Sequence, residues 1–285
     1  MKKFVSYTII LLLSATLGLS KGAHVFSAII VDGDVSAKDG SKNISLEANS
    51  RIYESFSIII GNNSYLALIH VTGRTLELQT PGTYQAKDLS KMINEQLGDY
   101  TDEYKNFLFE DENKNSNYSK YAAIQRDLPQ IINILVPKNM KIIPSKSFSI
   151  HWSSSIHNGQ YKITIEDLMQ EKIISEETSD TSFIIDLSKY PATSYYKVII
   201  SCNGYKSETS LRTYKHIAKL QKELDVAYAT YDEQKALDCV IIAKYYERHH
   251  LLLHSQYYLE KAIKITDKDS YKKYYNTFLS NYNIK

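Results

Sequence analysis

The chain has 285 residues, of which 43% are hydrophobic and 23% charged, so it has the composition of a soluble globular protein with about two domains. Its 10 Gly and 5 Pro exclude a collagen-like chain, and its apolar content excludes a disordered one. The 34 Lys and Arg against 32 Asp and Glu give a net charge of +2, too small for the positive field that nucleic acids require. We expect no nucleic-acid partner.

Residues 1–22 have the layout of a secretory signal peptide. Two lysines follow Met1, residues 4–19 are uncharged and rich in Ile and Leu, and small or polar residues come next. The alternative is a membrane anchor, but this uncharged helix would reach only about 24 Å, less than the ~30 Å hydrocarbon core. We therefore expect cleavage between Ser20 and Ala23. That predicts an exported protein, periplasmic or extracellular, with no stable membrane anchor after cleavage.

Residues 24–88 are typical of a small antiparallel β-domain. Runs of β-prone residues alternate with turn residues about every 8–12 positions. Leu76 and Leu78 alternate with polar neighbours, so one face of that strand is expected to be buried. The expected strands are Val25–Val31, Asn43–Leu46, Ile52–Ile60, Tyr65–Val71 and Thr75–Leu78.

Four short segments of this β-domain share a pattern in which turn residues are followed by an apolar strand. They are Gly33-Asp34-Val35, Asn63–Leu68, Gly73 with Leu76–Leu78, and Pro81–Tyr84. With these segments the zone resembles the FecR-type domain of bacterial cell-envelope proteins. The resemblance implies a small β-domain without catalytic residues. Because that family includes periplasmic signal receivers, a sensor or regulatory role is the first alternative function.

Residues 89–130 are predicted to be a polar linker with helical segments. Leu89, Met92, Ile93 and Leu97 have helical spacing. The segment between positions 95 and 112 then contains seven acidic residues and a single basic residue, Lys105. A calcium site is the alternative to a solvated linker, but the carboxylates lack the Asp-x-Asp-x-Asp-Gly spacing that wraps this ion. We therefore favour the linker.

Residues 131–212 return to strand-like patterning with seven short runs. Phe148, Ile150 and Trp152 alternate on one face, and so do Tyr196, Val198 and Ile200. Two facing sheets of such strands bury one apolar layer. Trp152 and Tyr196-Lys197-Val198 make this zone similar to fibronectin type III or immunoglobulin-like sandwiches, which implies a spacing or binding role.

Residues 213–285 contain no Gly or Pro, and their apolar residues recur with helical periodicity. The expected helices are His216–Tyr231, Glu233–Arg248, Leu251–Ile265 and Ser270–Tyr282. Helices of this length are not stable alone, so they must pack together. The whole chain is therefore predicted to be a multidomain α+β protein with a helical C-terminal region.

The second and third of these helices resemble a tetratricopeptide repeat, which is a helix hairpin of 34 residues. The matching positions are Ala236, Ile242, Ala243, Tyr246, Ser255, Leu259 and Ala262. Cys239 replaces the usual Trp, and Asp267 replaces the final Pro. The resemblance implies antiparallel stacking, and it leaves any peptide-binding residues unassigned because only one repeat matches.

The sequence lacks the common nucleophile, phosphate-binding and zinc-protease motifs. His249, His250 and His254 form the densest histidine group, in which His250 and His254 are four apart and could hold zinc with Glu247, but surface or packing roles are favoured. Cys202 and Cys239 are interpreted as small buried residues, with a disulfide as the alternative. We therefore expect no catalytic residue, no cofactor and no metal site.

The 24 Tyr are three times the 8 Phe. Because adjacent aromatic residues cannot share a helix face, one member of each Tyr pair is expected to be exposed, and such residues favour interfaces. A compositional preference for Tyr over Phe is the alternative. The candidate partner-binding residues are Tyr245, Tyr257, Tyr258, Tyr274 and Tyr275. The predicted function is that of an exported, non-enzymatic envelope protein for protein–protein interaction or scaffolding, with a sensor module or an enzyme with an unrecognised site as alternatives.

Overall fold

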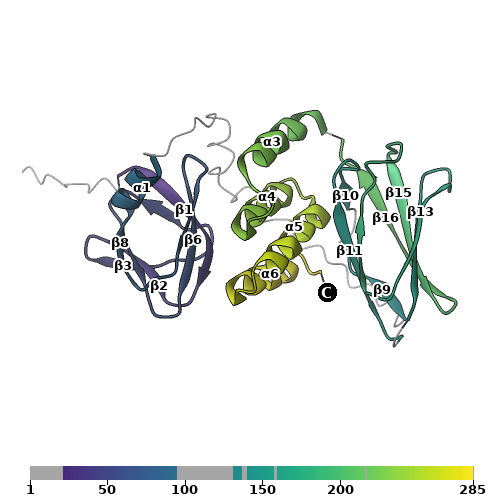
Figure 1. Ribbon diagram of the computed structural model, residues 1–285, viewed down its shortest axis with the longest axis horizontal. Coiled ribbons are helices and arrows are strands. Elements are labelled where there is room, and N and C mark those ends of the chain that lie inside the picture. The colour runs from purple at the N-terminus through teal and green to yellow at the C-terminus, as the bar shows by residue number, and fades with distance from the viewer. Residues whose placement is uncertain (1–21, 95–130, 137–139, 157–158, 216, 285) are drawn as a thin grey trace, which may run out of the picture.

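The protein is an α+β molecule in which sheets occupy the first two-thirds of the chain and four packed helices follow, as the sequence predicts. The computed structural model describes residues 22–94, 131–136, 140–156, 159–215 and 217–284. Apart from Gly22, the expected signal peptide lies outside these residues, and so does the acidic run of the linker. In Figure 1 the helices lie between two β-modules, so the C-terminal segment forms the centre of the molecule.

The first β-module consists of two four-stranded sheets. Their strand orders are β4-β1-β6-β7 and β3-β2-β5-β8. Apolar side chains such as Phe26, Ile58 and Leu68 fill the space between them. The strands are β1 His24–Asp32, β2 Val35–Asp39, β3 Lys42–Ser45, β4 Arg51–Tyr53, β5 Ser57–Ile60, β6 Tyr65–His70, β7 Thr75–Leu78 and β8 Gly82–Gln85, followed by helix α1 Ala86–Asn94.

One strand that the sequence predicts as continuous is divided between the two sheets of this module. The run Ile52–Ile60 breaks into β4 and β5 at a turn in which the Phe56 amide donates to the Tyr53 carbonyl at 2.9 Å. β4 pairs with β1 in one sheet, and β5 pairs with β2 in the other. The apolar pattern alone did not reveal this crossing, because Ile52, Phe56 and Ile58 are all buried on either side of the turn.

The second β-module is a sandwich of a three-stranded sheet, ordered β14-β11-β9, and a five-stranded sheet, ordered β10-β16-β15-β12-β13. Phe148, Ile150 and Trp152 of β11 point into the core, where the Trp152 ring meets Tyr161 edge-on at 5.4 Å. The strands are β9 Ile132–Ile134, β10 Lys141–Ile142, β11 Phe148–Ser154, β12 Tyr161–Glu166, β13 Lys172–Thr178, β14 Ser182–Ile185, β15 Tyr195–Cys202 and β16 Tyr205–Thr213.

Four helices follow the sandwich, close to the expected boundaries. They are α3 Ile217–Thr230, α4 Ala236–Arg248, α5 Leu252–Ile265 and α6 Asp269–Asn281. A three-residue turn reverses the chain between α4 and α5, and His250 takes φ +55° there. The tight turn makes α4 and α5 an antiparallel hairpin.

The helices cover one outer sheet face on each β-module. Every residue of β6 is buried, because the module core lies under one face and the helices lie over the other. Tyr65, Ala67 and Ile69 of β6 belong to the same buried cluster as the helices and the sandwich core. On the other side, α5 packs against β11 of the three-stranded sheet. The layers are therefore sheet, sheet, helices, sheet and sheet (Figure 1).

Candidate functional site: the two faces of the helical block

The helices contact the first β-module mainly through aromatic side chains and their hydroxyl groups. The hydroxyls of Tyr65 and Tyr271 lie 3.0 Å apart in the buried interface, and Tyr65 also donates to Glu77 at 2.8 Å. Tyr231 donates to the Gly73 carbonyl at 2.9 Å. Burial raises the pKa of Tyr271 to about 12 and raises the pKa of Tyr65 as well. Both phenols are therefore neutral at physiological pH.

Charged side chains of the helices ring this aromatic contact. Lys273 lies 2.5 Å from the Asp32 carboxylate, and Lys268 lies 3.2 Å from Glu77. Lys244 donates to the amide oxygen of Asn49 at 3.0 Å. Solvent reaches most of these groups, so each ion pair stabilises the interface only slightly.

The sandwich side of the helical block depends on a buried histidine. The Ile143 amide donates to His254 Nε2 at 2.9 Å, so His254 Nδ1 carries the proton and donates to the Ser147 carbonyl at 2.9 Å. His254 is completely buried, and this burial lowers its pKa to about 4. A neutral imidazole thus satisfies two backbone groups of the sandwich from within α5.

A carboxylate forms the second polar contact on this side. Glu260 Oε1 lies 2.6 Å from His151 Nε2 of β11 and accepts from the Tyr275 hydroxyl at 2.7 Å. Gln256 donates to both Glu260 and Tyr275, at 3.1 and 3.0 Å. Burial alone would raise the pKa of Glu260, but the hydrogen bond and charge attraction of His151 outweigh it and lower that pKa.

Three tyrosines from three helices meet inside the block. The Tyr228 hydroxyl lies 2.6 Å from that of Tyr246 and 2.8 Å from that of Tyr258. The rings of Tyr246 and Tyr258 stack with centroids 5.7 Å apart, and Lys146 of the sandwich lies 4.1 Å above the Tyr228 ring. Burial raises the pKa of all three phenols. The cluster ties α3, α4 and α5 together.

The five candidate partner-binding tyrosines do not form one exposed surface. Tyr245 is 1% exposed and Tyr258 is 5% exposed, so the exposure expected of these two is wrong. The spacing argument fails because α4 is covered on more than one side: Tyr246 faces α5, while burial and the nearby Glu223 of α3 raise the pKa of Tyr245. The other three, Tyr257, Tyr274 and Tyr275, are half-buried.

Two of the three clustered histidines, His249 in the α4–α5 turn and His254 within α5, have different surroundings. His249 Nε2 lies 2.9 Å from Glu223, whereas both ring nitrogens of His254 are occupied by the sandwich backbone. In the part of the chain that the structure describes, no group of three or more His, Cys, Asp or Glu side chains is placed to hold a metal ion. Cys202 and Cys239 are buried free thiols, and burial raises the pKa of Cys239 to about 12.

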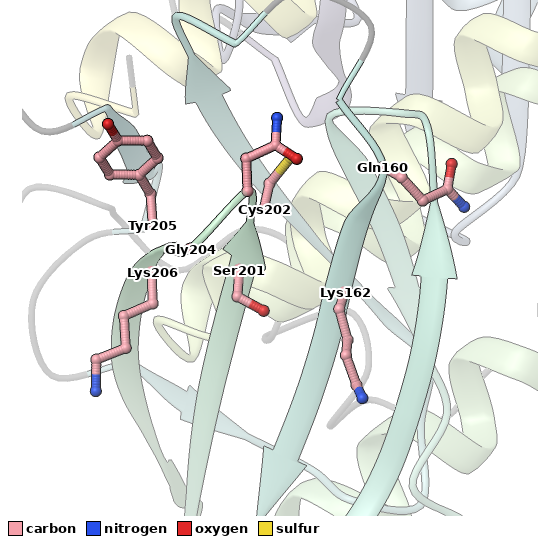
Figure 2. A pocket seen from close by; sticks show the side chains of 8 residues that line it. Gln160, Lys162, Ser201, Cys202, Gly204, Tyr205 and Lys206 are labelled. Atoms are coloured by element: carbon pink, nitrogen blue, oxygen red, sulfur yellow. The ribbon is translucent and has the colours of Figure 1, made fainter.

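A shallow hollow of about 340 Å³ lies where the β15–β16 turn meets the start of β12. Figure 2 shows its lining on these three strands, with Lys162 and Lys206 on the outer two. Cys202 lies against Gly159, where an added Cβ would stand 2.8 Å from the sulfur. The thiol is thus packed rather than offered to the hollow. The lining residues are Gln160, Lys162, Ser201, Cys202, Asn203, Gly204, Tyr205 and Lys206.

Comparison with known proteins adds little to this geometry. No protein-family model matches the chain, and no curated protein matches it. Among solved structures, the chain is similar to the fibronectin(III)-like modules of CbhA from Clostridium thermocellum. The identity is 8%, the match covers 66% of this chain and 78% of that one, and the TM-score is 0.21. Within the described residues, no helix has both the length and the apolar character needed to span a membrane.

Proposed function

We propose that the protein is an exported, non-enzymatic component of the cell envelope that acts as a scaffold for protein–protein contact. The supporting observation is the single buried cluster that runs from β6 through the helices into the sandwich core. Independent modules joined by linkers rotate freely, whereas a large apolar interface between modules holds them still. The helical block would therefore present the outer sheets of both modules to partners at one fixed spacing.

Each part of this scaffold is proposed to belong to a class of binding modules. Residues 24–88 would be FecR-like, residues 131–212 fibronectin type III-like or immunoglobulin-like, and residues 213–285 tetratricopeptide-like. For the sandwich, support comes from the Tyr196 hydroxyl, which accepts the Thr193 amide at 3.1 Å. Such a corner, in which a tyrosine binds the backbone just upstream, recurs in immunoglobulin-like domains.

The helix hairpin supports the tetratricopeptide-like proposal through its small residues. Ala243 of α4 and Ser255 and Ala262 of α5 are all buried, as close approach of two helices requires. A single repeat does not bury its apolar faces by itself. Here α3, α6 and the two β-modules would cover those faces, which explains why one hairpin suffices in a scaffold of this design.

The fixed spacing can be measured with spin labels on the two modules. Lys42 of β3 and Lys206 of β16 are exposed, and the native thiols are buried, so Lys42→Cys and Lys206→Cys would accept the labels selectively. A narrow distance distribution by double electron–electron resonance is expected. A matched sample with Ile69→Asp, which places a charge in the interface of β6 with the helices, should give a broad one. A broad distribution in the unaltered background would contradict the scaffold proposal.

Export and partner contact need separate measurements in cells. Cell fractionation should recover the protein outside the cytoplasm, with a mature N-terminus between Ser20 and Ala23. Crosslinked affinity purification from intact cells should then recover an envelope protein that rebinds the purified chain. A cytoplasmic protein with an uncut leader would exclude the export proposal, and failure of every recovered protein to rebind would exclude the interaction role.

A further inference from the structure

The hairpin between β12 and β13 carries two apolar side chains into solvent. Leu168 is 62% exposed and Met169 is 78% exposed, and they are neighbours at the tip of the loop. β12 and β13 are the last two strands of the five-stranded sheet, at the edge opposite β10, which is a strand of that sheet that contacts α5. Exposed apolar residues that are scattered singly need no explanation, whereas contiguous exposed apolar surface, especially with a polar rim, is typical of interaction sites.

This tip is held in one conformation by its own hydrogen bonds. The Asp167 carboxylate accepts the amides of Met169 and Glu171 at 2.8 and 2.9 Å. The backbone of Asp167 also donates to the Glu171 carbonyl at 3.0 Å and accepts the Gln170 amide at 3.1 Å. Because the loop is already ordered, binding through it would lose little conformational entropy.

Gln170 completes the turn in the left-handed region, with φ +64°. This conformation is unfavourable for a residue other than glycine. The turn therefore keeps a strained backbone while placing Leu168 and Met169 outward, where neither side chain contributes to the core of the sandwich. The two side chains are therefore available for contact with another molecule.

The charges beside the tip indicate what it contacts. Glu166, Asp167 and Glu171 flank the two apolar side chains in the hairpin, which also contains Lys172. Lys197 lies opposite Glu166 on β15, but it is ion-paired with Glu208 at 3.0 Å, so acidic groups predominate beside the tip. Anionic membrane surfaces attract basic segments and repel acidic ones. We propose that the Leu168–Met169 tip docks into an apolar pocket with a basic rim on a partner protein. This inference rests on the proposed interaction function and names the surface that would carry it.

The first step of the test places a photo-crosslinking amino acid at Met169 in the full-length chain and irradiates intact cells. The matched control carries the same amino acid at Met92 of α1, which is also an exposed methionine, 64% accessible. A discrete adduct is expected from position 169 and not from position 92. Adducts from neither position, or equal adducts from both, would overturn the docking proposal.

The second step measures binding of the crosslinked partner in purified form. Leu168→Ser with Met169→Ser should weaken binding at least about tenfold, as loss of an interface anchor does. Glu171→Lys should weaken it less, with a smaller dependence on NaCl concentration. Met92→Ser should leave the affinity unchanged, and all variants should keep the unfolding midpoint of the parent. Unchanged affinity in the Leu168→Ser, Met169→Ser variant would overturn the proposal.

Two other occupants would be recognised by the same experiments. An adduct of twice the mass of the chain would identify a second copy, and binding to phosphatidylglycerol vesicles would identify a lipid surface. Either result overturns the proposed pocket. If affinity purification recovers a partner that never crosslinks at position 169, the docking role of the tip is excluded but the proposed scaffold function is not. Failure of the docking proposal can therefore be distinguished from failure of the scaffold proposal.

Discussion

The two faces of the helical block use different chemistry for the same task. On the first β-module, neutral phenols and an apolar strand form the contact, and charged pairs stay at the rim. On the sandwich, His254 and Glu260 carry titratable groups into the contact itself. The first face should therefore be insensitive to pH near neutrality, whereas the second should weaken as acid protonates its imidazole. The predictions below test this contrast, beginning with the largest expected effect.

Acid should destabilise the protein through its buried histidines. His254 and, inside the first module, His70 have a pKa lowered by burial from 6.5 to about 4. The unfolded chain then binds more protons than the folded one between these values, so stability falls as pH decreases from about 6.5 to about 4. Each shift corresponds to at most about 3 kcal/mol. Urea unfolding at pH 7, 5 and 4 measures the loss.

A variant at His70 separates the contributions of the two histidines to this acid-induced loss of stability. His70 bonds Thr72 and Ser90 through its two ring nitrogens, which His70→Gln can replace in part. This variant should show about half the loss of stability between pH 7 and 4. A loss equal to that of the parent would mean that His70 does not contribute.

Replacing His254 by phenylalanine should cost about 4 kcal/mol. The ring would still fill the space, but the Ile143 amide and the Ser147 carbonyl would lose their partners, and each unpaired buried group costs about 1–3 kcal/mol. His250→Asn is the control, because His250 is exposed and asparagine tolerates its positive φ. Urea unfolding at pH 7 gives both values. A loss below about 1 kcal/mol for His254→Phe would show that water or the backbone replaces the imidazole.

The face on the first module should be tested with two neighbouring residues of β6. Ile69 faces the helices, whereas Leu68 faces the core of the module. Ile69→Ala and Leu68→Ala should each cost about 3 kcal/mol, since both leave a cavity. If the five layers unfold as one unit, calorimetry should show a single transition that both changes lower. Two transitions, of which Leu68→Ala lowers only one, would mean that the module unfolds separately.

The sequence predicts the parts of this architecture that depend on local patterns better than the parts that depend on packing between distant segments. Helical periodicity and the lack of Gly and Pro correctly predict four helices, because both depend only on residues that are close together in the sequence. They do not predict that the helices lie between the β-modules, since an apolar stripe does not identify what covers it. The continuous apolar run Tyr65–Ile69 of β6 was the available signal, because a strand buried on one face usually alternates.

The candidate site was predicted less well than the fold, for a related reason. Assigning one tyrosine of each pair to solvent assumes that a helix has a single buried side, and α4 has more than one. Tyr245 and Tyr246 are both buried. His254 has the same local sequence signal as an exposed histidine, and only the fold brings Ile143 and Ser147 to it from more than a hundred residues away.

The smallest losses of stability should come from changes to the polar contacts between the helices and the first β-module. Comparing the loss for a buried hydroxyl contact with the loss for a rim ion pair tests which of them stabilises this face more. Tyr271→Phe removes the hydroxyl contact with Tyr65 and should cost about 1 kcal/mol. Lys273→Met removes a rim ion pair with Asp32 and should cost no more than about 0.5 kcal/mol, less at high salt. Urea unfolding at 50 mM and 500 mM NaCl distinguishes them. If Lys273→Met cost more than Tyr271→Phe at both salt concentrations, ion pairs rather than the buried aromatic contact would hold this face, and the proposed contrast between an aromatic face and one with buried titratable groups would be wrong.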